Sequence, residues 1–325
     1  MSNFIRLVQN EQVKLYVRVA TWVMFGILAA IILLGAVIVR FLDDGSLTEY
    51  GDNWREEIQE ENQKLTQEME EMSSDSADGG FSVEMINGST IERNNYYLEN
   101  DIKPHTYDAW QFVYENAGLA SIISLFTIIV AAGIIANEFK WGTIKLLLIR
   151  PVSRLKVMAA KYVSVLLFAL TMLAFLLVFS WISGAIIFGV DGMNPSIVVD
   201  RGGEFIQLNV VKETIMDYSF SMVNLVMMAT FAFMISSIFR SSGMAIGLAI
   251  FLMFAGNSVV GFVSQYDWAK FILFANTDLK QYTAGREPWI EGMTMGFSIS
   301  MLLVYYVVFL AASWLAFTKR DVAGH

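Results

Sequence analysis

The sequence lacks cysteine altogether and has only two histidines among its 325 residues. Without cysteine there is no disulfide framework, no thiol catalysis and no cysteine metal site. His105 and His325 are far apart in the chain, and neither has a second plausible ligand beside it in the sequence. We therefore expect no metal site.

Sequence motifs of nucleotide and peptide chemistry are missing as well. The phosphate-cradling pattern G-x-x-x-x-G-K-[ST] does not occur. Neither G-x-S-x-G nor H-E-x-x-H is present. We therefore predict that the chain is not an enzyme and that it holds no catalytic or cofactor-binding residues, and we expect no nucleic-acid partner.

Apolar residues dominate what is present. The chain is 55% hydrophobic and 16% charged, with a mean hydropathy of +0.51, which is typical of a membrane protein. A helix needs about 20 apolar residues to cross a bilayer. Six stretches are long enough: 19–39, 117–136, 163–188, 218–239, 243–263 and 292–317. The first is too long for a signal peptide, and we interpret it as a retained anchor.

The distribution of charge predicts how these spans are oriented. Four segments together hold 12 Lys+Arg and 3 Asp+Glu, whereas the rest of the chain holds 10 and 28. The four basic segments are 1–18, 137–162, 240–242 and 318–325. Basic segments stay in the cytoplasm, so we predict that both termini are cytoplasmic. The insert 40–116, the loop 189–217 and the segment 264–291 then lie on the outer side.

Two polar regions flank the first span. Residues 1–18 mix apolar and charged side chains at helical spacing, which predicts an amphipathic helix on the cytosolic membrane face; the alternative is a solvated start of the first span. In the insert, 54–72 reads as a very acidic helix, 73–80 as a turn-rich break and 81–86 as a short strand. We interpret the acidic face as solvated rather than as a calcium site.

The segment 264–291 contains an apolar octet, 268–275, that is too short to cross the membrane. Asn276-Thr277-Asp278 then resembles a helix cap or break. The octet fits a re-entrant segment shielded by protein. It fits an amphipathic helix on the outer surface equally well, and length alone does not separate the two.

The predicted spans contain no Asp, Glu, Lys, Arg or His. Ion-driven transporters usually need such groups, so a self-powered pump is disfavoured. Asn224 and Asn257 are candidates for a substrate path, although most polar groups in spans bond neighbouring helices. Gly243 and Gly247 have the spacing of a close helix contact, either within one subunit or between two.

The basic segment (137–162) has the pattern of two short helices joined by a turn. Apolar and charged residues alternate at helical spacing over 138–149, and Arg150-Pro151 ends that helix. Ser153 is placed to cap a second helix that continues into the third span. A plain basic loop is the alternative.

The pattern E-F-x-x-G-T-I-K-x-L-L-x-R-P-V-S-R-x-K at 138–156 resembles the coupling region of ABC-2 type (type V) exporter permeases. The order of a surface helix, six spans and a short element before the sixth span is similar as well, and the large insert resembles a Bacillus-type branch. The resemblance implies an all-α membrane protein whose six transmembrane helices follow an N-terminal amphipathic surface helix, with an extracytoplasmic α-rich insert.

The resemblance also implies partners. A homo- or heterodimer of permeases in the bacterial plasma membrane would bind two copies of an ABC ATPase subunit, which carry the ATP and Mg. The residues implied to contact the ATPase are Glu138, Phe139, Gly142, Thr143, Lys145, Arg150 and Arg154. The expected cargo is hydrophobic or amphipathic: an antibiotic, antimicrobial peptide or lipid. The alternatives are a membrane sensor or scaffold that uses the acidic insert, and an ion-driven secondary transporter.

Overall fold

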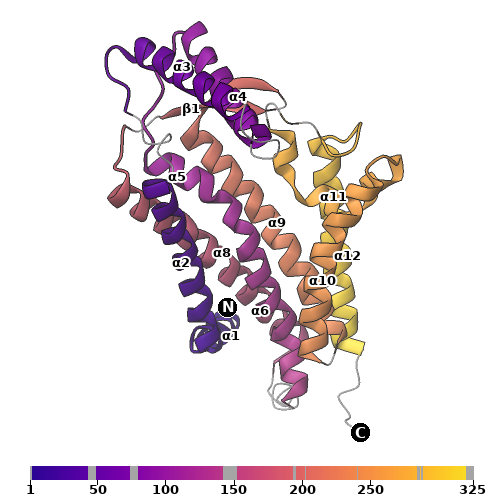
Figure 1. Ribbon diagram of the computed structural model, residues 1–325. Coiled ribbons are helices and arrows are strands. Elements are labelled where there is room, and N and C mark those ends of the chain that lie inside the picture. The colour runs from indigo at the N-terminus through magenta and orange to yellow at the C-terminus, as the bar shows by residue number, and fades with distance from the viewer. Residues whose placement is uncertain are drawn as a thin grey trace.

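The computed structural model is a bundle of long helices with a smaller helical hairpin beyond one end (Figure 1). It describes residues 2–42, 49–73, 80–141, 152–192, 195–201, 203–239, 241–283, 286 and 288–319. The α-helices in these ranges are α1 (Ser2–Tyr16), α2 (Val19–Leu42), α3 (Trp54–Ser73), α4 (Gly80–Glu99), α5 (Ala109–Asn116), α6 (Ala120–Lys140), α8 (Arg154–Ile187), α9 (Val210–Ile238), α10 (Ser242–Val263), α11 (Leu273–Thr277) and α12 (Met295–Lys319).

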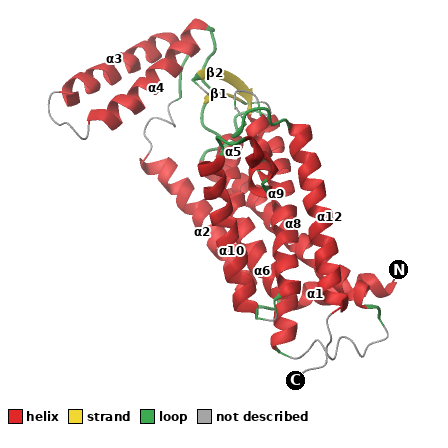
Figure 2. Ribbon diagram, turned by 90° about the vertical axis from the view of Figure 1, so that its right-hand side faces the viewer, coloured by secondary structure: helices red, strands yellow, loops and turns green. Residues whose placement is uncertain are grey.

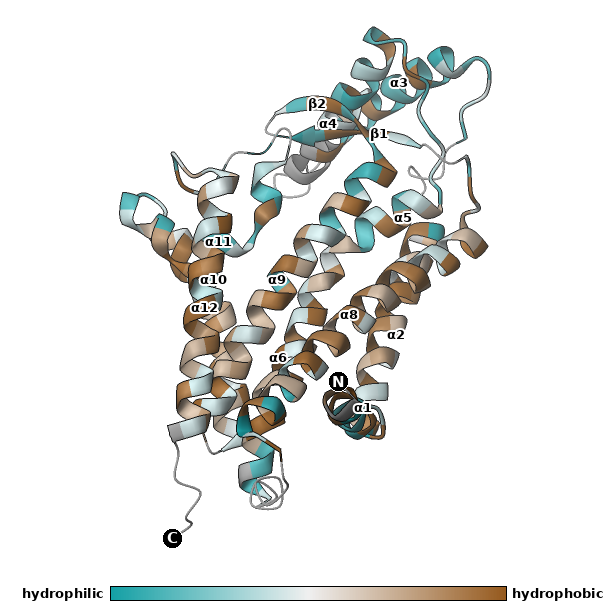
Figure 3. Cartoon of the chain, turned by 180° about the vertical axis from the view of Figure 1, so that it is seen from behind, coloured by the Kyte–Doolittle hydropathy of each residue, from teal (hydrophilic) through white to brown (hydrophobic). Residues whose placement is uncertain are grey.

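Six helical stretches are long and apolar enough to cross a membrane, which confirms the predicted all-α membrane fold. They are Val19–Phe41, Ala109–Glu138, Arg154–Ile187, Val210–Ile238, Ser242–Val263 and Met295–Thr318. Figure 3 shows hydrophobic residues along these helices and hydrophilic residues gathered on α3 and α4.

Several helices start well before the apolar stretches that predicted them. α8 begins at Arg154 because the Ser153 side chain accepts a hydrogen bond from the Lys156 N–H, as expected. α9 begins at Val210, where Asn209 caps the helix by accepting from the Lys212 N–H. Hydropathy marks only the apolar part of each helix, so it misses these polar first turns.

α6 and α9 form the centre of the bundle. In each, 67% of the apolar window is buried within the chain, against 17% in α2, 11% in α10 and 17% in α12. The core at their contact consists of fully buried small and large side chains, among them Ile128, Ala132, Ala229 and Phe233. α2, α10 and α12 therefore present most of their apolar surface outward, as helices in lipid do.

The start of α1 and the end of α12 lie at the same end of the bundle, called here the terminal end (Figure 1). α1 is a helix separate from α2, as expected for the amphipathic N-terminal segment, because Val17 and Arg18 interrupt the two. Leu15 is buried, and the Gln12 amide donates a hydrogen bond of 2.9 Å to the Ser164 carbonyl on α8. α1 is thus docked across the bundle.

α3 and α4 form a hairpin at the opposite end, called the hairpin end (Figure 2). The predicted helix over 54–72 is confirmed as α3, but the strand predicted at 81–86 is wrong, because this stretch belongs to α4. A strand there would leave its backbone groups without a partner, whereas a helix satisfies them internally. Side-chain amides join the two helices: Asn94 donates to Asn62 at 2.9 Å.

A β-hairpin that the sequence did not predict lies in the loop 189–217. β1 (Ser196–Arg201) pairs antiparallel with β2 (Glu204–Asn209), and the turn places Gly203 at φ +86°. Arg201, at the end of β1, donates a 2.8 Å hydrogen bond to the buried Glu213 of α9. Burial disfavours the charged arginine, but Glu213 and Tyr114 outweigh this and raise the pKa of Arg201. The pair fastens the hairpin to the bundle.

The segment 264–291 forms three short helical pieces: η2 (Asp267–Phe271), α11 and η3 (Leu279–Tyr282). The single amphipathic surface helix considered above does not form. The fully buried Asn276 explains the break, because its amide donates to the carbonyls of Lys270 and Ile272, both at 2.8 Å. α11 packs on α10 and α12, and η3 packs on α9 and α12; insertion of the segment into the membrane stays a prediction.

Candidate functional site

A cavity of about 620 Å³ lies between α6, α9, α10 and α11. We call it the α9–α10 cavity. Its size falls within the range of small-molecule sites, about 300–1,000 Å³. The lining residues are Ser121, Ile122, Ser124, Leu125, Asn224, Met228, Met253, Phe254, Asn257, Val260, Phe274, Ala275, Thr277, Asp278 and Trp289.

The structure brings together the two asparagines singled out from the sequence. Asn224 on α9 and Asn257 on α10 both line this cavity. The Asn224 Oδ1 atom is buried and has no hydrogen-bond partner in the described structure, whereas Asn257 is exposed. A buried acceptor without a partner is costly, but this oxygen has almost no accessible surface, so Asn224 lines the cavity through its other atoms.

The apolar wall of the cavity was not predicted. Met228, Met253 and Phe274 look like ordinary core residues in the sequence, and only the packing of α9, α10 and α11 reveals that they face a space. Phe274 lies directly against Gly256, where a Cβ atom would overlap its ring. The absence of a side chain at Gly256 therefore sets how closely α11 approaches α10.

Asp278 lies at the mouth of the cavity and is the one ionisable residue among its described lining residues. A smaller hollow of about 200 Å³ adjoins it and shares Asp278 and Asn224. Lys280 lines this hollow, and its Nζ lies 3.4 Å from a carboxylate oxygen of Asp217 on α9. Asp278 also caps η3 by accepting a 3.1 Å hydrogen bond from the Lys280 N–H.

A buried ion-pair cluster joins three helices at the terminal end. The Lys161 ammonium on α8 is 1% exposed and lies 2.8 Å from oxygens of both Glu11 on α1 and Glu138 on α6. Lys14 lies 2.7 Å from Glu11 and 3.5 Å from Glu138. Glu138, predicted to contact an ATPase, thus also ties α6 to α8.

The other residues implied in the ATPase contact are only partly described. Phe139 belongs to α6, and Arg154 is exposed at the start of α8, where it donates a 3.3 Å hydrogen bond to the Thr318 carbonyl. Gly142, Thr143, Lys145 and Arg150 lie outside the described residues. Their role stays a prediction.

Charged residues occur near the ends of the candidate spanning helices, outside the uncharged stretches 163–188 and 218–239 that hydropathy predicts. Lys161, Glu213 and Asp217 lie within the candidate spans Arg154–Ile187 and Val210–Ile238. Each is paired with an opposite charge. The helices are longer than their apolar stretches, which is why these groups were placed outside the spans.

Gly243 and Gly247 lie exposed on α10. A Cβ atom at Gly247 would meet nothing within 4 Å, and one at Gly243 would meet only the Ser241 hydroxyl that caps the same helix. Close packing within one subunit therefore does not occur at these glycines in the described structure. A contact between two subunits stays a prediction.

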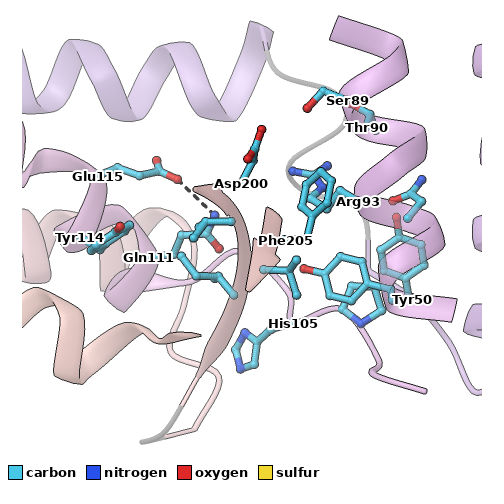
Figure 4. Close-up of a pocket in the computed structure, with 16 residues that line it drawn as sticks. Tyr50, Ser89, Thr90, Arg93, His105, Gln111, Tyr114, Glu115, Asp200 and Phe205 are labelled. Carbon is cyan, nitrogen blue, oxygen red and sulfur yellow. Dashed lines mark hydrogen bonds between the residues drawn. The ribbon is translucent and has the colours of Figure 1, made fainter. Parts of the chain in front are cut away.

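A second pocket, of about 360 Å³, lies at the hairpin end (Figure 4). α4, α5, β1 and β2 surround it, together with the stretch around His105. Figure 4 shows Tyr50, Arg93 and Phe205 around one side of it and the Gln111–Glu115 hydrogen bond on the other. Burial raises the pKa of Tyr50 and of Tyr97, so both phenols are neutral donors at neutral pH.

No group of three or more His, Asp or Glu in the part of the chain that the structure describes is placed to hold a metal ion.

The fold and its six apolar helices define a multi-pass membrane protein. The chain belongs to the DUF2705 family, whose description is "protein of unknown function". The family model matches residues 81–323.

Two Bacillus subtilis (strain 168) proteins are similar to the chain. It is 40% identical to the uncharacterized protein YhcI over 98% of this chain and all of that protein. It is 32% identical to the uncharacterized membrane protein YdbK over 62% of this chain and 78% of that protein.

Proposed function

We propose that the chain is the permease subunit of an ATP-driven exporter of the ABC-2 type, in the bacterial plasma membrane with both termini in the cytoplasm. It does not hydrolyse ATP itself; a separate ATPase subunit supplies the force. The cargo is a hydrophobic or amphipathic molecule that occupies the α9–α10 cavity. Two permeases and two ATPase subunits form the working assembly.

The observation that carries this proposal is the course of α6. This helix contributes Ser121 and Ser124 to the cavity wall and Glu138 to the ion-pair cluster at the start of the basic segment (137–162). α6 and α9, which also lines the cavity, contact each other more extensively than any other pair of helices in the described structure. A displacement applied to the basic segment would therefore move the wall of the cavity as a rigid element.

The first prediction concerns Arg154→Glu. Affinity-tagged full-length chain, expressed in the source bacterium and extracted from its membranes, is expected to bring down an ABC ATPase identified by mass spectrometry. Arg154→Glu is expected to reduce recovered ATPase and ATP hydrolysis about tenfold or more, because it places like charge at a contact. An acidic residue is favoured in the first turn of a helix, but the substitution also removes the hydrogen bond to the Thr318 carbonyl. SDS unfolding of the variant therefore accompanies the measurement, and unchanged stability is expected.

The matched control is Arg286→Glu, which reverses an exposed charge in the segment 264–291, at the other end of the bundle. It is expected to leave ATPase recovery unchanged. Equal recovery with Arg154→Glu and the unmodified chain would contradict the proposed contact. Vigorous transport by the purified chain alone, driven by an ion gradient without ATP, would instead favour a secondary transporter.

The pocket at the hairpin end favours a second candidate function, a membrane sensor. It is formed by the insert and the β-hairpin, together with α5 at the start of the candidate span Ala109–Glu138. Deleting residues 46–100 distinguishes the two functions. A permease is expected to retain basal stimulation of its ATPase after the deletion, whereas a sensor loses its response to ligand.

A further inference from the structure

The α9–α10 cavity has an uneven chemical character. Its walls are apolar, formed by residues such as Met228, Met253 and Phe254, and among the described lining residues the one charge is the carboxylate of Asp278. No lysine, arginine or histidine is among those lining residues. The cavity therefore combines an apolar body with an anionic mouth.

The charged group that is available to a ligand is an acceptor, the carboxylate of Asp278, because this residue is exposed and lines the cavity. Lys280 is the nearby cation, but it lines the adjoining hollow and lies 3.4 Å from Asp217. Trp289, also on the lining, offers an aromatic face, and such faces attract cations.

We infer that this cavity binds an amphipathic cation, a molecule with an apolar body and a protonated amine that donates N–H hydrogen bonds. The amine would lie at Asp278, and the apolar body would fill the space between the methionine and phenylalanine side chains. An anion would meet a carboxylate with no cation among the described lining residues, so it would be rejected. This inference rests on the proposed function, since it names the class of cargo.

Binding of two dyes with a shared xanthene skeleton tests the inference. Rhodamine 6G is a lipophilic cation with N–H groups, and fluorescein is an anion. Fluorescence polarisation would be measured with the full-length chain in phosphatidylcholine nanodiscs, with empty nanodiscs subtracted. We expect saturable binding of rhodamine 6G and no saturable binding of fluorescein. No binding of rhodamine 6G above empty nanodiscs, or tighter binding of fluorescein, would overturn the inference.

Substitution of Asp278 tests the location of the charge. Asp278→Asn removes the charge but keeps an oxygen that caps η3, so the fold is expected to remain. It should weaken rhodamine 6G binding about threefold to fivefold, the scale of a partly exposed ion pair, and should abolish most of the salt dependence. Asp267→Asn is the control, because it removes an exposed carboxylate from the same segment outside the cavity. If both substitutions weaken rhodamine 6G binding equally, the overall negative charge of the segment attracts the dye, which would contradict a binding site at Asp278.

Two sources of such a cation are distinguished by the lipid. Phosphatidylethanolamine has an ammonium headgroup with N–H donors, and phosphatidylcholine has none. If adding phosphatidylethanolamine to the nanodiscs displaces the dye, the cation is a lipid headgroup; if binding is unchanged, it is a soluble amphipath. The dye experiment contains no ATPase, so it tests the cavity independently of export. If dye binding depends on Asp278 but no ATPase is recovered with the tagged chain, only the proposed export function is rejected.

Discussion

Replacing Lys161 with methionine is expected to lower the free energy of unfolding by about 3 kcal/mol and to release α1 from the bundle. The Lys161 ammonium lies 2.8 Å from a carboxylate oxygen of Glu11 and 2.8 Å from one of Glu138, and its side chain is 1% exposed. Removing it leaves two buried carboxylates beside each other. Breaking a buried pair in this way usually costs about 3–5 kcal/mol, and the lower value applies because Lys14 remains next to both carboxylates.

Two measurements check this expectation. Unfolding by SDS in mixed micelles reports the stability of the full-length chain. Limited trypsin digestion reports the docking of α1, because cleavage after Arg6 or Lys14 requires this helix to leave α8. The substitution is expected to make α1 cleavable at protease concentrations at which the unmodified chain is intact.

Lys14→Met is the matched control, since Lys14 belongs to the same cluster but its side chain is 39% exposed. A partly exposed ion pair contributes little, so this substitution is expected to have a much smaller effect on unfolding and on cleavage after Arg6, the trypsin site in α1 that it leaves intact. The double substitution Glu11→Met with Lys161→Met should recover at least half of the loss, because it leaves Glu138 beside Lys14 and fills the site with apolar atoms. Equal effects of the two lysine substitutions would contradict a structural role for the buried cluster.

This cluster also shows what sequence reasoning could and could not find. Local spacing predicts the cap at Ser153, which is confirmed, because a cap involves neighbours in the chain. The rest of the pattern in the basic segment (137–162) falls largely on residues outside the described ranges and stays a prediction. The partner of Lys161 is 150 residues away on α1. Nothing in the local pattern distinguishes a lysine that pairs with a distant glutamate from one that faces water.

The difference between local signals and contacts with distant residues also explains the rest of the fold. The six spans follow from hydropathy alone, which is a property of each stretch. The β-hairpin 196–209 and the helix at 81–86 were missed because short segments adopt whichever structure satisfies their backbone in the folded context. Within the candidate site, Asn224 and Asn257 were identifiable as polar residues in apolar runs. Their apolar neighbours in the cavity were not, because a methionine gives the same signal in a core and in a cavity wall.

Gly256→Ala is the second substitution for which we expect a large effect on stability, and the size of the effect depends on Phe274. An alanine in the interior of a helix normally stabilises it by about 0.5–1 kcal/mol relative to glycine. At position 256 the added Cβ would overlap the Phe274 ring, so α11 or the ring must shift. Overpacking of this kind usually costs about 1–3 kcal/mol. A net loss of stability is therefore expected, together with weaker rhodamine 6G binding because the displaced ring lines the cavity.

The control lies five residues further along the same helix. A Cβ atom at Gly261 would meet nothing within 4 Å, so Gly261→Ala is expected to leave stability unchanged or raise it slightly. In a Phe274→Ala background the clash is absent, and Gly256→Ala is then expected to become neutral or stabilising. SDS unfolding would be measured for the unmodified chain, for Gly256→Ala, for Phe274→Ala and for the double substitution. The reversal of sign between the two backgrounds isolates the contact between α10 and α11. If Gly256→Ala destabilises equally in both backgrounds, the Phe274 ring does not set the approach of α11, and the cavity owes its shape to another contact.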